Sequence, residues 1–284
     1  MTNIAIAGST GYLGSKLKSK LLRNNYNVID IIRNNSSVEL HKNFAGTQIT
    51  FDNFLSGDNN IKIDILINLI CCYGRNSESF SDLFHANIEI PTKLYEYCNQ
   101  NNVIFLNSGT VLPPEISAYA KTKNIFQELL KGHNNSNVVI NLVIDQFYGK
   151  DCSNNNFITF FINELIKNTE SIELTKGTQT REFIYIDDLT SAFLFIIDNI
   201  KNLPVELNQI AINTKQPIRL KDFLLEVWKQ YKIINPFCET KLLFGAKEMR
   251  NGETNTNFKE YISLLELGWK PSENIISGIS KILK

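Results

Sequence analysis

The stretch Asn3-Ile-Ala-Ile-Ala-Gly8-Ser-Thr-Gly11-Tyr-Leu-Gly14 decides the fold. An apolar strand runs directly into three glycines, and a helical pattern follows over Leu13–Arg23. In this context Gly8 allows a tight turn, Gly11 lets the backbone approach a pyrophosphate, and Gly14 lets the helix pack closely on the strand. The N–H groups at the helix start would bind the phosphates. The stretch therefore predicts a dinucleotide-binding unit.

Apolar strands continue to alternate with helical patterns along the chain. The predicted strands of the first half are Asn3–Ala7, Asn27–Ile32, Gln48–Phe51, Ile63–Ile70, Val103–Asn107 and Val138–Asp145, with helices over Phe80–Asn99 and Tyr119–Lys131. This order predicts an α/β protein with a Rossmann-type, doubly wound parallel sheet.

Shorter elements follow Gly149. We expect a short strand over Phe183–Ile186 and helices over Leu189–Asn199 and Leu220–Tyr231. The predicted organisation is a dinucleotide-binding domain over residues 1–150 and a smaller C-terminal α/β substrate-binding domain over residues 151–284. Elements around residues 183–200 are expected to pack back on the first domain.

Composition excludes several classes of function. The 284 residues carry 29 Lys+Arg and 29 Asp+Glu, so no net charge points to nucleic acid or to an anionic membrane. The longest apolar run, Ile63–Cys72, is far too short to span a bilayer, and the chain reaches Gly8 too soon for a signal peptide. Five cysteines without CxxC spacing indicate neither a disulfide framework nor a metal site. We expect a cytoplasmic protein.

The end of the second strand favours NADP(H) over NAD(H). An acid usually holds the ribose 2′-hydroxyl of NAD at this point, but this strand ends in Ile32 and Arg33 follows. The Arg33 guanidinium has the charge and shape to bind a 2′-phosphate. Asp30 lies two residues earlier and remains a rival ligand for a 2′-hydroxyl.

A Tyr-x-x-x-Lys pair supplies acid–base chemistry. Tyr119 and Lys123 open a predicted helix, and their spacing places them on one face. A nearby ammonium is expected to lower the pKa of the phenol and make it a usable acid near neutrality. Ser108, just after the fifth strand, can bind the same substrate oxygen.

Over essentially its full length the chain resembles the extended short-chain dehydrogenase/reductase family of nucleotide-sugar enzymes. The motifs are the glycine stretch, Tyr119-x-x-x-Lys123, Gln146-Phe-Tyr-Gly149 and Arg181-Glu-Phe-Ile-Tyr-Ile-Asp-Asp188. The resemblance implies Ser108 as the catalytic hydroxyl, Tyr119 as the acid and Lys123 as its activator and a ribose ligand.

The same resemblance implies further ligands. The cofactor contacts are Gly8, Thr10, Gly11, Tyr12, Leu13, Gly14, Arg33, Asp52, Cys71, Lys123 and Phe147. The substrate contacts are Tyr73, Ser108, Tyr119, Phe157, Arg181 and Arg250, with the arginines at the diphosphate or ribose of a sugar nucleotide. An ordinary salt-bridged arginine is the alternative for Arg181 and Arg250.

Three segments are similar to one branch of the family, the CDP-paratose and CDP-abequose synthases. They are Asn68–Arg75, Asn107–Pro114 and Phe244–Arg250. This implies NADPH-dependent reduction of the 4-keto group of a CDP- or dTDP-linked 6-deoxy or 3,6-dideoxy-4-hexulose, for surface polysaccharide such as O-antigen. Dehydratases of the family carry an Asp-Glu pair where this chain has Gly109 and Thr110, so dehydration is not expected.

Two other functions remain open at this point. A nucleotide-sugar 4-epimerase with tightly bound NAD would use the same three catalytic residues, and a cofactor-sensing regulator would need none of them. The resemblance also implies a homodimer in which the helices over Phe80–Asn99 and Tyr119–Lys131 form a four-helix bundle with their copies.

Overall fold

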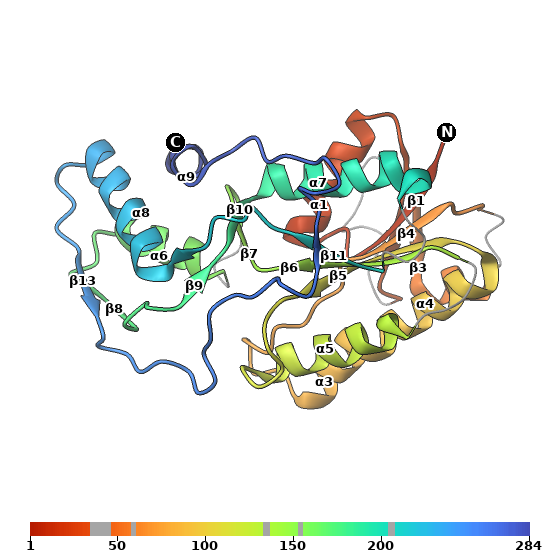
Figure 1. The fold of residues 1–284 in the computed structure, drawn as a ribbon, viewed down its shortest axis with the longest axis horizontal. Coiled ribbons are helices and arrows are strands. Elements are labelled where there is room, and N and C mark those ends of the chain that lie inside the picture. The colour runs from red at the N-terminus through yellow and green to blue at the C-terminus, as the bar shows by residue number, and fades with distance from the viewer. Residues whose placement is uncertain (35–46, 58–60, 133–136, 153–155, 204–207) are drawn as a thin grey trace.

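A large parallel sheet forms the centre of the computed structural model, which describes residues 1–34, 47–57, 61–132, 137–152, 156–203 and 208–284 (Figure 1). Its strands lie in the order β14-β11-β6-β5-β4-β1-β2-β3, and all neighbouring pairs are parallel. They are β1 (Asn3–Ala7), β2 (Asn27–Ile32), β3 (Thr47–Thr50), β4 (Ile65–Asn68), β5 (Ile104–Thr110), β6 (Val139–Ile144), β11 (Gln209–Ile212) and β14 (Ile262–Ser263). The predicted fold class is confirmed.

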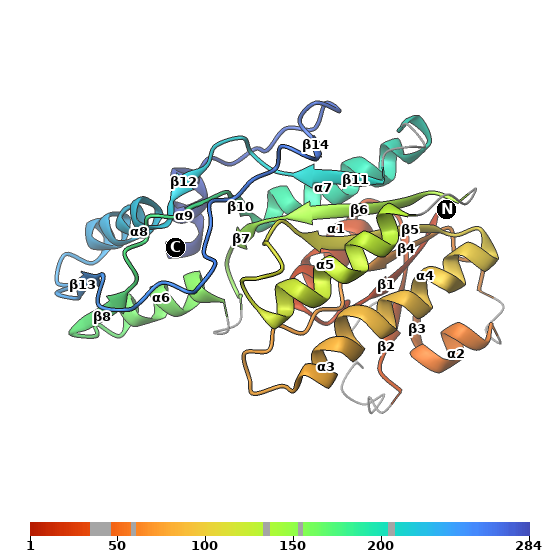
Figure 2. The same cartoon turned by 60° about the horizontal axis from the view of Figure 1, so that its bottom comes forward.

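Helices cover both faces of the sheet (Figures 1 and 2). One face carries α1 (Tyr12–Arg23) and α7 (Ile186–Asn199), which pack on each other. The other carries α2 (Phe51–Ser56), α3 (Phe80–Phe84), the π-helix η2 (His85–Glu89), α4 (Ile90–Asn101) and α5 (Ala118–Lys131).

Side-chain alternation in β1 explains why the sheet needs helices on both sides. Ile4 and Ile6 join the apolar cluster under α1 and α7, whereas Ala5 and Ala7 join the cluster under α4 and α5. All four side chains are fully buried, as period-two alternation requires in a strand covered on both faces.

A smaller lobe follows β6 at one end of the sheet (Figure 1). It contains α6 (Phe157–Ile166), α8 (Leu220–Ile234), α9 (Ile275–Leu283) and three two-stranded sheets, with the short 3₁₀-helix η3 (Ile200–Asn202) after α7. The pairs are β7 (Gln146–Tyr148) with β10 (Phe183–Tyr185), β9 (Thr180–Arg181) with β12 (Ile218–Arg219), and β8 (Ser171–Leu174) with β13 (Lys241–Phe244).

Three elements that follow residue 150 belong to the large sheet and its covering helices and not to the smaller lobe. Helix α7 packs on α1, and the short strands β11 and β14 extend the large sheet beyond β6. The division into a dinucleotide-binding domain over residues 1–150 and a substrate-binding domain over residues 151–284, with elements around residues 183–200 packing back on the first, stays a prediction.

Several predicted elements have different bounds, and two of these differences have a clear structural reason. Strand β5 continues to Thr110 instead of ending at Asn107, because its pairing with β6 extends to Thr110 opposite Ile144. The predicted Phe80–Asn99 helix passes through the π-turn η2 directly before Pro91, whose missing N–H cannot bond the carbonyl one turn back.

Within the described residues, no helix is long and apolar enough to cross a membrane. The same residues contain no group of three His, Cys, Asp or Glu side chains that could hold a metal ion.

The buried carboxylate of Asp188 ties the C-terminal segment to α7. It accepts hydrogen bonds from the Ser272 N–H (2.8 Å), the Ser272 hydroxyl (2.7 Å) and the Glu273 N–H (2.9 Å). We expect Asp188→Ala to lower the free energy of unfolding by about 1.5–3 kcal/mol, since the hydrogen bonds to a buried charged acceptor are lost. Urea denaturation measures this. Asp187→Ala, an exposed acid in the same first turn, is the control, and equal losses in both variants would contradict the anchor.

Candidate active site

The turn between β1 and α1 has the shape of a phosphate cradle. Gly8 has φ +91°, and a Cβ on Gly14 would lie 2.1 Å from the Gly8 carbonyl oxygen, so only glycine allows this approach. Helix α1 starts after Gly11 without a side-chain cap, which leaves its first N–H groups for a ligand. Thr10 is exposed at the tip of the turn and Leu13 is buried beneath it.

Tyr12 connects this turn to the end of β7. Its ring stacks on Phe147 with centroids 6.3 Å apart, and its hydroxyl donates to the Lys150 carbonyl at 3.0 Å. The predicted cofactor residues of the glycine turn and Phe147 therefore lie together.

The end of β2 presents Arg33 and not Asp30. Arg33 is exposed directly after the strand, whereas Asp30 is buried and paired with Lys18 of α1. Asp52 opens α2 after the neighbouring strand β3, is exposed, and its N–H donates to Asn34 Oδ1 at 3.0 Å. Arg33 and Asp52 thus follow the ends of adjacent strands, at the edge that holds the glycine turn.

Lys123 is the most unusual side chain of the site. It is 2% exposed, and its Nζ has no hydrogen-bond partner among the residues that the structure describes. Burial lowers its pKa, which the nearby Cys71 thiol partly offsets. A buried amine without a partner fits a ligand hydroxyl, as the predicted contact with a cofactor ribose requires.

Tyr119 lies one turn before Lys123 on α5, whose N-cap is Ser117. It hydrogen-bonds to Cys71, which follows β4, and to Thr110 at the end of β5. Burial raises the pKa of Tyr119 well above its ordinary value, while the Thr110 hydrogen bond acts in the opposite direction. The expected lowering of this pKa by Lys123 is therefore wrong. The raised pKa keeps the phenol protonated, as a proton donor must be.

Thr110 is the residue of this cluster that the sequence motifs did not identify. Ser108 lies inside β5 opposite Leu142, two residues before Thr110 and on the same side of the strand. The alternating hydroxyls Ser108-x-Thr110 could have indicated that both side chains face the site. They did not, because the predicted strand ended at Asn107 and left Thr110 outside β5.

Tyr73 and Arg75 extend the cluster outward from the loop after β4. The Tyr73 ring lies 4.9 Å from the Tyr119 ring, and the Arg75 guanidinium lies 4.9 Å from the centre of the Tyr73 ring. Because Arg75 also lines a cavity beside the smaller lobe, these side chains connect the Tyr119 cluster to that cavity.

The cavity has a volume of about 300 Å³. Its charged lining consists of four cations, Arg75, Arg181, Lys247 and Arg250, and two carboxylates, Glu173 and Glu253. Its apolar lining includes Phe157, Leu174, Phe183 and Phe244. The predicted substrate residues Phe157, Arg181 and Arg250 are thus brought to one cavity, which combines charge for an anion with an aromatic wall.

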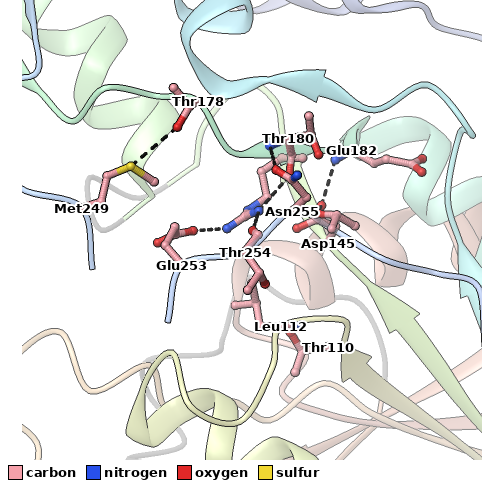
Figure 3. A network of polar contacts seen from close by, with 12 residues as sticks. Thr110, Leu112, Asp145, Thr178, Thr180, Glu182, Met249, Glu253, Thr254 and Asn255 are labelled. Carbon is pink, nitrogen blue, oxygen red and sulfur yellow. Dashed lines mark hydrogen bonds and ion pairs between the residues drawn. The ribbon is translucent and has the colours of Figure 1, made fainter. Parts of the chain in front are cut away.

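Arg181 is held by the segment that follows β13. Its Nη1 donates to the carbonyls of Thr180 (2.7 Å) and Thr254 (2.6 Å), and its Nη2 is paired with Glu253. Figure 3 shows Glu253, Thr254 and Asn255 gathered against β9. The alternative of a salt-bridged structural arginine is therefore supported for Arg181, which also lines the cavity.

Asp145, directly after β6, belongs to the same network (Figure 3). Its carboxylate accepts hydrogen bonds from the Glu182 N–H at 2.8 Å and from the Thr256 hydroxyl. Burial raises the pKa of Asp145 to about 6, although these hydrogen bonds lower it in part. No local pattern in the sequence indicated this carboxyl, since its partners lie 37 and 111 residues away.

Comparisons with known proteins agree with the motifs. The chain matches the NAD dependent epimerase/dehydratase family over residues 4–210. It is 28% identical over 300 residues to the CDP-abequose synthase of Salmonella typhimurium, covering 99% of this chain and 97% of that protein. It is 25% identical over 292 residues to the CDP-abequose synthase of Yersinia pseudotuberculosis, covering 98% and 99%. The resemblance inferred from the sequence is confirmed.

A solved structure agrees on the fold. The UDP-glucuronic acid 4-epimerase from Bacillus cereus, in complex with UDP-glucuronic acid and NAD, superposes with a TM-score of 0.78 at 22% identity. The match covers 99% of this chain and 98% of that one.

The raised pKa of Asp145 predicts a pH dependence of stability. In the unfolded chain the pKa of an aspartate carboxyl is about 3.9. Between pH 4 and 6 the Asp145 carboxyl is therefore ionised in the unfolded chain and protonated in the folded chain. Stability should therefore fall as pH rises through this window, by about 2 kcal/mol between pH 4 and 7. Urea denaturation of the wild type against Asp145→Asn, which cannot ionise, isolates this effect. Parallel pH profiles for the two proteins would show that the carboxyl is not perturbed.

Proposed function

This chain belongs to the NAD dependent epimerase/dehydratase family, and from that premise we propose that it is an NADP(H)-dependent nucleotide-sugar 4-ketoreductase. The observation that carries the proposal is the cluster at the carboxyl edge of the sheet. There the protonated phenol of Tyr119, the hydroxyl of Thr110 and the buried, unpartnered amine of Lys123 meet beside Cys71, among the residues that the structure describes.

The residues divide the chemistry as follows. A bound nicotinamide cofactor supplies the hydride. Tyr119 donates its proton to the oxygen of the C4 carbonyl as charge develops there, and Ser108 donates a hydrogen bond to the same oxygen. Lys123 holds the cofactor ribose through the amine that lacks a protein partner. A phenol with a raised pKa suits this direction of reaction, because reduction needs an acid.

Two observations favour NADP(H). Arg33 follows a strand that ends in Ile32, so no carboxylate opposes a 2′-phosphate there. Asp30, the rival ligand, is buried against Lys18. Asp52, which follows the neighbouring strand, is proposed to contact the adenine half of either cofactor and does not contribute to this preference.

The substrate class follows from the relatives and from the cavity. Two relatives that match the whole chain are named CDP-abequose synthase. We assign a CDP- or dTDP-linked 6-deoxy or 3,6-dideoxy-4-hexulose to the site, with the hexose at Tyr73 and Tyr119 and the nucleotide in the cavity lined by Phe157, Arg181 and Arg250. The product would enter deoxysugar synthesis for surface polysaccharide in the cytoplasm.

The same proposal includes a homodimer. Helices α3 and α5 contact each other and expose Phe80, Phe84, Ile125 and Leu129, each at least 40% accessible. An apolar face of this kind is suited to pairing with its copy in a four-helix bundle.

Reduction and epimerisation are distinguished by a direct assay. A 4-ketoreductase oxidises NADPH stoichiometrically with a CDP- or dTDP-4-keto sugar, and NMR of the product shows a new C4 hydroxyl. An epimerase interconverts two nucleotide sugars without net cofactor consumption. No NADPH oxidation with any 4-keto sugar, combined with such interconversion, would overturn the proposal in favour of the epimerase.

Arg33 should set the cofactor preference. A charge-assisted contact to a 2′-phosphate contributes about 1.5–3 kcal/mol, so kcat/KM for NADPH should exceed that for NADH at least about tenfold. Arg33→Ala should remove this preference. Arg23→Ala, an exposed arginine at the end of α1, should leave it intact. Equal kcat/KM values for the two cofactors in the wild type would count against NADP(H).

Tyr119→Phe should separate chemistry from binding. The change keeps the ring and its packing on Tyr73 but deletes the proton donor, so kcat should fall by about 10²–10⁴ with little change in KM. Lys123→Met should also weaken cofactor binding, because the amine has two roles. Tyr97→Phe, whose ring packs on Phe54 away from the site, is the matched control. If Tyr119→Phe keeps more than a tenth of wild-type turnover, another group is the acid.

A further inference from the structure

Gln179 brings an unused hydrogen-bond acceptor to the substrate cavity. Its side chain is 8% exposed and lines the cavity, and its Oε1 is buried without a partner among the described residues. An acceptor in this state costs free energy unless a ligand supplies a donor. Gln179 is thus a cavity-lining side chain that is more than nine-tenths buried.

The backbone around Gln179 is firmly held, so this acceptor is preorganised. The Gln179 carbonyl accepts a hydrogen bond from the Leu220 N–H at 3.0 Å, and the Gly177 carbonyl accepts one from the Lys221 N–H at 2.9 Å, both at the start of α8. On the other side, the Thr180 N–H donates to Asn255 Oδ1 at 2.8 Å. A side chain carried on such a backbone loses little entropy when a ligand binds.

The order of residues along the chain indicates which part of a nucleotide sugar reaches Gln179. Tyr185 at the end of β10 lies next to β7 in the cofactor half, and the chain runs back through Arg181 and Gln179 to Leu174 of β8. Gln179 lies at a bend two residues before Arg181, and both side chains line the cavity, so a ligand group beside Arg181 is also near Gln179. With the hexose at Tyr119 and the diphosphate near Arg181, the next part outward is the nucleoside.

We infer that Gln179 is a specificity-determining residue whose amide oxygen accepts a hydrogen bond from the nucleoside, from either the ribose 2′-hydroxyl or the 4-amino group of cytosine. This inference rests on the proposed nucleotide-sugar function. Both donors are present in CDP. A 2′-deoxynucleotide lacks the first, and a uracil or thymine nucleotide lacks the second.

Calorimetric titration of the NADP⁺-bound full-length protein with CDP, dCDP, UDP and dTDP tests the inference without catalysis. Gln179→Met keeps the length of the side chain and removes the acceptor, so its affinity for CDP should fall about 5- to 10-fold. Gln179→Glu keeps an acceptor at the same distance and should retain the discrimination between nucleotides. Gln216→Met, at an exposed turn, is the control for a surface glutamine.

The four nucleotides identify the donor. If the 2′-hydroxyl is the partner, Gln179→Met binds dCDP as well as the wild type does; if the 4-amino group is the partner, UDP affinity is unchanged. Unaltered CDP affinity in Gln179→Met, or an equal loss for all four nucleotides, would overturn the inference and leave the proposed function standing. A wild-type protein that binds none of the four would overturn both. The melting temperature and NADP⁺ affinity of each variant identify a folding defect.

Discussion

The burial of the Lys123 amine without a protein partner is the constraint on which the site depends. Moving an amine out of water without a new hydrogen bond costs several kcal/mol at the upper end of the usual range, so the surrounding structure must be stable enough to hold it. Helix α5 provides that stability. Its apolar face packs on β5, and Thr122 accepts a hydrogen bond from Asn87 of η2 at 3.0 Å, one residue before the lysine.

A row of amide side chains fixes the strands directly beneath this site. Asn68 on β4 donates to Asn107 on β5 at 2.8 Å, and Asn107 donates to Asn141 on β6 at 2.7 Å. Asn141 then donates to Gln209 on β11 at 2.9 Å. All four residues lie at the same register, so the row sets the relative height of the strand ends. One step further along β5 is Ser108, and the loop after β4 carries Cys71 and Tyr73.

The parts of the site that depend on neighbouring residues were predictable from sequence. The glycine turn and the Tyr119–Lys123 pair have fixed spacings, and local geometry places them in one turn and within one helix. Thr110 and Asp145 were not predictable in this way. The hydrogen bond of Thr110 to Tyr119 depends on how far β5 continues beside β6, and Asp145 bonds to residues from two distant segments. The expected pKa of Tyr119 was wrong for a related reason, because burial in the assembled fold outweighs any nearby positive charge.

The cations of the cavity are not equivalent, and this changes how the arginine motif is understood. Arg181 is buried and paired with Glu253, so an anion that approaches it must compete with a carboxylate already in contact. Without that carboxylate the guanidinium would be a buried, uncompensated charge, so Glu253 stabilises the fold at this point. Arg75 and Arg250 are exposed at the same cavity and keep most of their hydration. A diphosphate therefore gains attraction first from the exposed arginines, while Arg181 fixes the segment after β13 that carries Arg250 to the cavity.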